Sequence, residues 1–292
     1  MKIIVPGASG RTEPIDLESG LQARYERLLG ILRACGTVCV GYSGGVDSVL
    51  LVQAAVQALG PENVLAVTGI SASVPQLQRE LARSCAARIG VPHLELDTDE
   101  LSDANYAANP ENRCYFCKTE LWTQLSRVAA QRGLACVLDG SNADDVRDHR
   151  PGMRAANEHA VRAPLLEAGL TKADVRALSR AFGLPTWDQP AAPCLASRLP
   201  YGLAVTPERL AQVERAEVAL RALGYRELRV RHHGDVARLE LPPDAIGQAA
   251  ARAAELVAAV RSAGFARLLL DVEGYRRGAL NEPLVQLRGN VA

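Results

Sequence analysis

Residues 36–48 read GTVCVGYSGGVDS, a short apolar segment followed directly by a pair of glycines and two serines. Residues 36–42 are rich in β-formers, and residues 49–60 have a helical composition that ends at Gly60, so the polar hexapeptide lies where a strand turns into a helix. Glycines at such a turn let backbone N–H groups approach an anion, which the helix dipole attracts. The stretch predicts a phosphate-binding loop in an α/β fold; the alternative is a glycine-rich turn that binds nothing.

The alternation of strands and helices continues along the chain. We predict further strands at 63–70, 93–99 and 134–140, and helices at 75–90 and 117–133. This order favours a parallel sheet that is covered by helices on both faces. Ligands of such sheets bind beyond the carboxyl ends of the strands.

The hexapeptide SGGVDS is not the Walker pattern, because no lysine follows the glycines. Backbone N–H groups of Gly44 and Gly45 and the hydroxyls of Ser43 and Ser48 are the predicted anion donors. Asp47 is a candidate ligand of Mg²⁺. A loop without the lysine suits a pyrophosphate that leaves as a unit.

A second polar loop, DGSNADD at 139–145, follows the last predicted strand of this series. Gly140 permits an unusual turn, and Asn142, Asp144 and Asp145 could meet ribose, Mg²⁺ or neighbouring backbone groups. Asn and Asp are also common in loops that bind nothing. The position of the loop beside SGGVDS favours a nucleotide role.

The second half of the chain predicts a smaller domain. Residues 141–163 are polar and expected to be loop-rich, Thr171 begins a helix that extends to 184, and residues 185–200 are rich in proline. After this segment the predicted order is helix, strand, strand, helix, strand, at 206–225, 226–232, 236–242, 243–264 and 265–272. We therefore predict a first domain over 1–202 and a small α+β domain over 203–292.

Charge and composition exclude several classes of protein. The 292 residues carry no formal net charge, which argues against a nucleic acid as the main partner. We find neither a signal peptide nor an apolar run long enough to span a bilayer, so we expect a cytoplasmic protein. Seven cysteines, an odd number, exclude a complete disulfide framework, and in a reducing compartment cysteines with a chemical role are more often metal ligands or nucleophiles.

The motif RCYFCK at 113–118 contains two of these cysteines, Cys114 and Cys117. A CxxC motif fits half of a zinc site, a redox disulfide or part of an iron–sulfur ligand set. There is no second CxxC, and the remaining candidate is Cys194 in PCLASR, within the proline-rich segment. Basic residues flank the three thiols and would favour their thiolate forms. The other cysteines are interpreted as buried small hydrophobes: Cys35, Cys39, Cys85 and Cys136.

Three thiolates leave one coordination position of a metal site unfilled. In an iron–sulfur cluster this position would be an open iron, at which sulfide could be carried.

The sequence resembles two nested groups of proteins. SGGVDS after the first strand resembles the PP-loop ATP pyrophosphatase superfamily, which has a Rossmann-like, HUP-type fold and cleaves ATP between its α and β phosphates. Four further segments are together similar to the LarE family: NRCYFCK, DGSNADDVRDHRPGMRAANE, residues 161–198 and LRVRHHGDVARLELP. Members of that family are ATP-dependent sulfurtransferases that act on pyridinium-3,5-biscarboxylic acid mononucleotide in the biosynthesis of the nickel-pincer nucleotide cofactor of lactate racemase.

The resemblance to this family implies roles for the cysteines. Cys194 matches the sulfur-handling cysteine. The presence of Cys114 and Cys117 matches a branch in which three cysteines hold a [4Fe-4S] cluster that binds an extra sulfide. One departure is Gln189, where a lysine is expected before PAAPCLASR; it puts one charge contact near the sulfur in doubt.

The resemblance also implies substrate-binding residues. Glu217, Arg229 and Arg231 match positions that face the phosphate of the mononucleotide or a neighbouring subunit, and Arg198 is a further candidate. Arg229 and Arg231 are two residues apart on a predicted strand, so their side chains share a face, and two guanidinium forks suit a phosphate. The alternative is a solvated strand face.

Three rival functions remain open from the sequence. A tRNA thiolase can also pair a PP-loop with a CxxC and a third cysteine, an amide-forming ligase would need ammonia and no cysteine triad, and a nucleotide-sensing module would use the CxxC only to hold a loop. The sulfurtransferase is favoured. It implies ATP and Mg²⁺ as cofactors and a homo-oligomer as the assembly; the sulfur donor is not fixed by the sequence.

Overall fold

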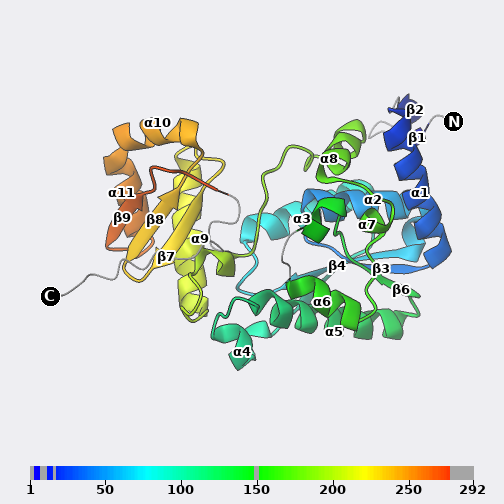
Figure 1. Ribbon diagram of the computed structural model, residues 1–292, viewed down its shortest axis with the longest axis horizontal. Coiled ribbons are helices and arrows are strands. Elements are labelled where there is room, and N and C mark those ends of the chain that lie inside the picture. Colours follow the sequence, from blue (N-terminus) through cyan, green and yellow to red (C-terminus); the bar gives the residue numbers. More distant parts are fainter. Residues whose placement is uncertain (1–2, 7–11, 16–17, 148–150, 277–292) are drawn as a thin grey trace. The chain divides into compact units, whose positions relative to one another are not determined.

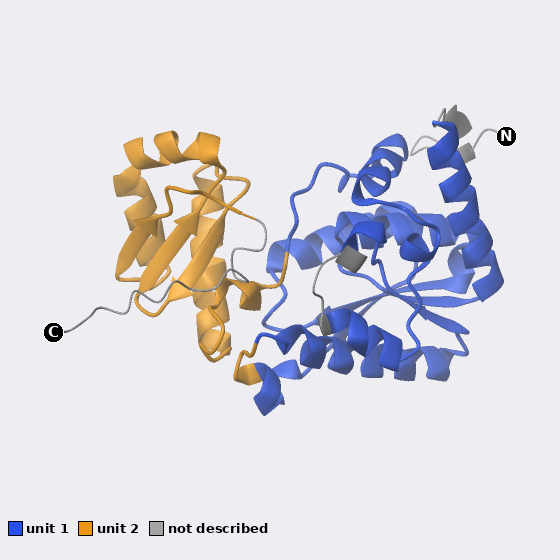
Figure 2. Ribbon diagram, in the orientation of Figure 1, with its two compact units in different colours: residues 1–106, 111–192 blue, residues 107–110, 193–292 orange. Residues whose placement is uncertain are grey.

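The computed structural model describes residues 3–6, 12–15, 18–147 and 151–276. It divides into two compact units: unit 1 contains residues 1–106 and 111–192, and unit 2 contains 107–110 and 193–292 (Figure 2). The proline-rich segment is split between the units after residue 192. The domain boundary after residue 202, in the sense of two parts that fold independently, stays a prediction.

Unit 1 is built on a four-stranded parallel sheet with the strand order β5-β4-β3-β6. Its strands are β3 (Val38–Gly41), β4 (Val64–Ile70), β5 (His93–Asp97) and β6 (Cys136–Leu138). Strands β4 and β5 extend the sheet on one side of β3, whereas β6 pairs with its other side. The strand order therefore reverses between β3 and β6, and open α/β sheets bind ligands at such a point. The predicted parallel α/β class is confirmed.

Helices cover both faces of this sheet (Figure 1). One face carries α1 (Ser19–Cys35), α2 (Val46–Leu59), α3 (Gln76–Ile89) and α8 (Lys172–Ala181), and the other carries α5 (Arg113–Arg132) and α6 (Pro151–Glu158). Val38 and Val40 pack into the core between the sheet and the first of these helix layers, and Cys39 packs into the core on the side of α5 and α6. The reason is that successive side chains of a strand point to opposite faces. None of the helices that the structure describes is long and apolar enough to cross a membrane.

The stretch 141–163 is less irregular than its polar composition predicts. It contains the 3₁₀-helix η3 (Ala143–Arg147) and α6, whose Ala155 and Ala156 are buried in the core between α5 and the sheet. Small side chains at these positions let α6 pack closely on α5, so tertiary packing outweighs the polar composition. The shorter elements of the chain up to residue 192 are β1 (Ile3–Pro6) and β2 (Thr12–Ile15), which pair antiparallel, α4 (Ala104–Ala107) and α7 (Pro164–Glu167).

Unit 2 has the predicted order of one helix, two strands, further helices and a third strand. Its elements are α9 (Pro207–Ala222), β7 (Arg229–His233), β8 (Val236–Glu240), α10 (Ile246–Ala251), α11 (Ala253–Ser262) and β9 (Arg267–Leu270). Strand β8 pairs antiparallel with β7 and parallel with β9. The prediction of a single helix over 243–264 is wrong, because the helix is interrupted at Arg252. The guanidinium of Arg252 donates to the Leu223 carbonyl oxygen at the end of α9 (3.0 Å), and this hydrogen bond holds the residue between α10 and α11 in place.

Candidate active site

The loop after β3 folds around the hydroxyl of Ser48. Ser48 Oγ accepts a hydrogen bond from the Ser43 N–H (3.2 Å) and donates one to the Gly45 carbonyl oxygen (3.1 Å). Gly44 has a φ of +73°, and a Cβ there would lie 2.9 Å from the Cα of Ala82, so only glycine fits. Gly45 precedes α2 and provides no side-chain cap, so the N–H groups of the first helical turn are left to bind an anion.

The second predicted loop contacts the first one. A Cβ on Gly140 would lie 3.2 Å from the backbone nitrogen of Ser48, a tight contact that glycine avoids because it has no side chain. Asn142 is fully buried; its Nδ2 donates to Asp47 Oδ1 (3.0 Å), and its N–H donates to Asp145 Oδ2 (3.0 Å). The structure thus brings together the loop residues that the sequence singled out after β3 and β6.

Lys172 completes this site and was missed from the sequence. Its Nζ contacts Asp47 Oδ2, and its backbone N–H donates to Asp144 Oδ2 (2.8 Å). Thr171 forms a capping box with Asp174, which fixes Lys172 as the first residue of α8. The capping residue was visible in the sequence, but nothing there placed the next side chain beside SGGVDS. The loop that lacks a lysine of its own receives one from a distant helix.

The CxxC motif lies in the first turn of α5, which begins four residues earlier than predicted. Cys114 is exposed and Cys117 is half-buried. Residues three apart share a helix face, so the two thiols lie on one side of α5. None of the seven cysteines, all of which lie within the described residues, forms a disulfide.

Cys194 lies in unit 2, where two buried ion pairs hold its turn. It precedes the 3₁₀-helix η4 (Leu195–Arg198), and Arg198 Nη1 donates to its carbonyl oxygen (2.9 Å). The Nε and Nη2 of the same guanidinium donate to the two carboxylate oxygens of Glu217 (2.8 and 3.1 Å). Burial raises the pKa of Glu217, but the charges of Arg198 and Arg221 and the hydrogen bonds from Arg198 and the Val230 N–H together lower it below its usual value. Arg198 and Glu217 therefore fix the position of Cys194.

Arg231 holds the same turn from β7. Its Nη1 donates to the Ser197 carbonyl oxygen (2.8 Å), and its Nε and Nη2 donate to Glu240 (2.9 and 2.7 Å). Arg229, two residues earlier, is buried with its guanidinium 5.0 Å from the ring centre of Tyr275. Burial, and to a lesser degree the charges of Arg198 and Arg231, lower the pKa of Arg229, so three arginine side chains lie near one another beside the turn. A role of these residues in binding substrate stays a prediction.

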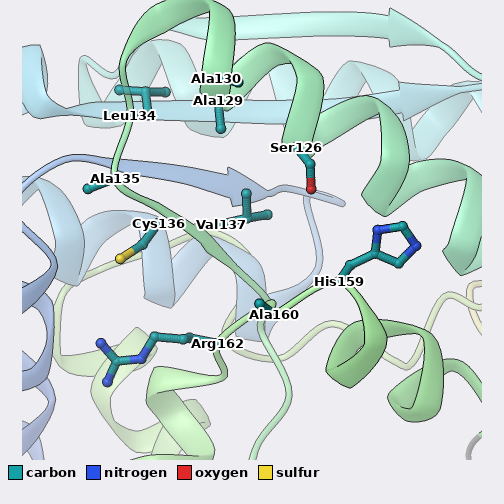
Figure 3. Close-up of a pocket in the computed structure, with 10 residues that line it drawn as sticks. All are labelled: Ser126, Ala129, Ala130, Leu134, Ala135, Cys136, Val137, His159, Ala160 and Arg162. Atoms are coloured by element: carbon teal, nitrogen blue, oxygen red, sulfur yellow. The ribbon is translucent and has the colours of Figure 1, made fainter.

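A cavity of about 290 Å³ lies at the opposite end of β6 from the loops, beside its first residue, Cys136 (Figure 3). Cys136 and Arg162 extend to one side of it and His159 to the other. Cys136 is therefore partly exposed and not buried as predicted, whereas Cys35, Cys39 and Cys85 are buried. The cavity contains none of the predicted site residues.

The predicted meeting of Cys114, Cys117 and Cys194 stays a prediction, because the CxxC belongs to unit 1 and Cys194 to unit 2. Within the described parts of the chain, no group of three or more His, Cys, Asp or Glu side chains is arranged to hold a metal ion.

The ion pair beneath Cys194 predicts a large effect on stability. Arg198→Met should lower the free energy of unfolding by about 3 kcal/mol or more, because it leaves the buried Glu217 carboxylate without its main partner. Arg221 also contacts Glu217 (2.9 Å) but is 27% exposed, so Arg221→Met, the matched control, should cost less than about 1 kcal/mol. Urea unfolding at pH 7 measures both. Equal losses in the two variants would contradict a special role for Arg198.

The comparisons with known proteins agree with this geometry. Residues 30–125 match the NAD synthase family. The chain is 44% identical to the uncharacterised protein slr1717 of Synechocystis over 91% of this chain and all of that protein. It is 36% identical to the pyridinium-3,5-bisthiocarboxylic acid mononucleotide synthase of Lactiplantibacillus plantarum, over 91% of this chain and 96% of the relative. A shorter match, 36% identical over 37% of the chain, is to the NH₃-dependent NAD⁺ synthetase of Chlorobaculum tepidum. The chain therefore belongs to the LarE family.

Proposed function

We propose that this protein is an ATP-dependent sulfurtransferase that converts the carboxylates of pyridinium-3,5-biscarboxylic acid mononucleotide into thiocarboxylates, for nickel-pincer cofactor biosynthesis. The observation that carries the proposal is membership of the LarE family over nearly the whole chain, including both units. The NAD synthase match covers residues 30–125, which contain SGGVDS, and supports the ATP-dependent step.

ATP binds at the two loops in this proposal. The N–H groups at the start of α2, with Ser43, Gly44, Gly45 and Ser48, hold the phosphates. Gly140, Asn142 and Asp145 form the wall beside them. Asp47, whose oxygens contact Asn142 and Lys172, would hold Mg²⁺, and oxygen ligands suit that ion. Lys172 then turns from Asp47 to the phosphates and neutralises the charge of the leaving pyrophosphate.

The first chemical step activates a carboxylate that is otherwise a poor electrophile. A carboxylate oxygen of the substrate attacks the α-phosphorus of ATP, the bond to the β-phosphate oxygen breaks, and pyrophosphate leaves. The product is an acyl-adenylate. Hydrosulfide then attacks the carbonyl carbon of the adenylate, AMP leaves with the former carboxylate oxygen, and loss of the sulfur proton gives a thiocarboxylate. The protein contributes positioning and charge stabilisation.

Cys194 handles the sulfur in this proposal, together with the CxxC pair. Its turn is held by two buried arginine–glutamate pairs, which would keep a reacting group in a fixed position. An i, i+3 pair of accessible thiols on α5 and a third thiol fit the donor set of a [4Fe-4S] cluster with one iron open. When bound, such a cluster would supply a place to carry sulfide.

The substrate phosphate is assigned to Arg229 and Arg231, which lie beside the buried pair of Arg198 and Glu217. Three guanidiniums against two buried carboxylates leave an excess of positive charge, which favours a dianion. The proposal also places the enzyme in the cytoplasm as a homo-oligomer, with no nucleic-acid partner.

Lys172 gives the sharpest test of the ATP-dependent step. Lys172→Met should lower kcat for substrate-dependent pyrophosphate release about 100-fold, because one charged group that stabilises the leaving pyrophosphate is lost. Lys172→Arg should recover part of the rate, since it keeps the charge. Pyrophosphate release is measured with ATP, Mg²⁺ and the pyridinium mononucleotide.

The matched control for Lys172 is Arg24→Met. It removes the ion pair between Arg24 and Asp174 (2.8 Å) in the same turn of α8 but leaves Asp47 untouched, so the rate should stay near that of the wild type. A wild-type rate in Lys172→Met would mean that this lysine only holds Asp47.

The cluster is tested by metal content. Protein reconstituted without oxygen should bind about four irons per chain and absorb broadly in the visible, as thiolate-bound clusters do. Cys194→Ala and Cys117→Ala should lose this iron, whereas Cys85→Ala, at a buried thiol outside the set, should keep it. Colourless protein with stoichiometric zinc, or iron retained by Cys194→Ala, would contradict the cluster.

A further inference from the structure

Cys35 and Cys136 form a pair of thiols that the proposed reaction does not use. Cys35 is the last residue of α1 and Cys136 is the first residue of β6, and both pack into the core on the α1 side of the sheet. The two thiol groups are in hydrogen-bond contact, and Cys136 Sγ lies 4.0 Å from the Cys35 carbonyl oxygen. A disulfide needs this closeness, because its two Cβ atoms must lie near each other.

The backbone beside the pair is held by strand pairing. The N–H of Cys136 donates to the Thr37 carbonyl oxygen (3.2 Å), and the N–H of Thr37 donates to the Cys35 carbonyl oxygen (2.9 Å). Val38 and Cys136 are partners in the register of β3 and β6. The contact between the two thiols is therefore built into the sheet and does not depend on the meeting of two mobile side chains.

Arg162 determines the charge at the pair. Its Nη1 donates to Cys35 Sγ (3.2 Å), and its Nε donates to Glu167 (3.2 Å), which fixes the guanidinium. Burial and the contact with Cys136 raise the pKa of Cys35 to about 11, so this thiol is a weak nucleophile at pH 7. The contact with Cys136 changes once that thiol is modified, and the neighbouring cation then stabilises a Cys35 thiolate.

Cys136 is the accessible member of the pair. It is partly exposed and lines the cavity of about 290 Å³ at the start of β6, whereas Cys35 is 4% exposed. Figure 3 shows the sulfur of Cys136 and the guanidinium of Arg162 on the same side of this cavity. Four of the lining residues are alanines, so a small reagent has room there. Cys39 and Cys85, which are buried, offer no such access.

We propose that Cys35 and Cys136 are a redox-active pair that closes to a disulfide when a low-molecular-weight disulfide reaches Cys136. After losing its proton to solvent, Cys136 attacks one sulfur of the reagent, the S–S bond of the reagent breaks, and a thiolate leaves with the electron pair. Cys35 then loses its proton and attacks the Cys136 sulfur of the mixed disulfide, and the second thiolate leaves. The two cysteines are oxidised by two electrons in total, and the reagent is reduced to two thiols.

The pair fits a regulatory role better than a structural one, because disulfides in reducing compartments are usually transient and redox-sensing. The proposal does not depend on the proposed sulfurtransferase activity, since neither cysteine belongs to the set of Cys114, Cys117 and Cys194.

Oxidation of the full chain with 2-hydroxyethyl disulfide tests the proposal. The remaining thiols are then blocked, and tryptic peptides are analysed by mass spectrometry without reductant. We expect a disulfide that joins peptide 34–79, which contains Cys35, to peptide 133–147, which contains Cys136, and that dithiothreitol breaks. Cys39→Ala is the matched control: it removes the other cysteine of peptide 34–79 and should leave the link unchanged. Oxidation of the CxxC does not interfere, because Cys114 and Cys117 lie in a separate peptide, 114–118.

Cys35→Ala tests the order of the two steps. It should retain the hydroxyethyl group on Cys136 as a mixed disulfide, because no second thiol is in place to release it, whereas the wild type should retain only traces. Cys136→Ala should leave Cys35 largely unmodified, since the accessible thiol is lost. An oxidised wild type without the link, a link that persists in Cys35→Ala through Cys39, or an unmodified Cys136 in Cys35→Ala would overturn the proposal.

Discussion

The Asp47 carboxylate joins the three segments that form the proposed ATP site. It lies in the first turn of α2, and its two oxygens contact the amide of Asn142 after β6 and the ammonium of Lys172 at the start of α8. The strand order brings the first two segments together, because β3 and β6 are neighbours at the point where the order reverses. The capping box of Thr171 and Asp174 adds the third. A site on three segments depends on the whole of unit 1, so its geometry is fixed by the fold.

Unit 2 supports Cys194, the proposed sulfur-handling residue, in a different way. Cys194 lies on a short turn without a long helix to fix it, and two buried arginines hold that turn through backbone carbonyl oxygens. Each arginine is fixed by a buried glutamate, Glu217 or Glu240. Buried pairs of this kind add little net stability, but the loss of one partner is costly. Their role here is therefore to fix a position, which sulfur transfer needs.

The sequence was sufficient for the features that depend on periodicity and on local signals. The four strands of the parallel sheet, the helices α2, α3, α5 and α8, the adjacency of SGGVDS and DGSNADD, and the cap at Thr171 follow from alternation, turn residues and capping chemistry. Lys172, the helix α6 and the break at Arg252 were missed, since each depends on contacts between residues far apart in the chain. Convergence of the three cysteines depends on how the two units are arranged, because Cys114 and Cys117 belong to unit 1 and Cys194 belongs to unit 2.

The central claim is that the substrate carboxylate is adenylated before sulfur enters. The most direct measurement uses the pyridinium mononucleotide with oxygen-18 in its carboxylates and follows the label by mass spectrometry after reaction with ATP. Attack of the carboxylate on the α-phosphorus predicts that AMP carries one labelled oxygen for each thiocarboxylate formed. Label in pyrophosphate, or unlabelled AMP beside thiocarboxylate product, would contradict the account.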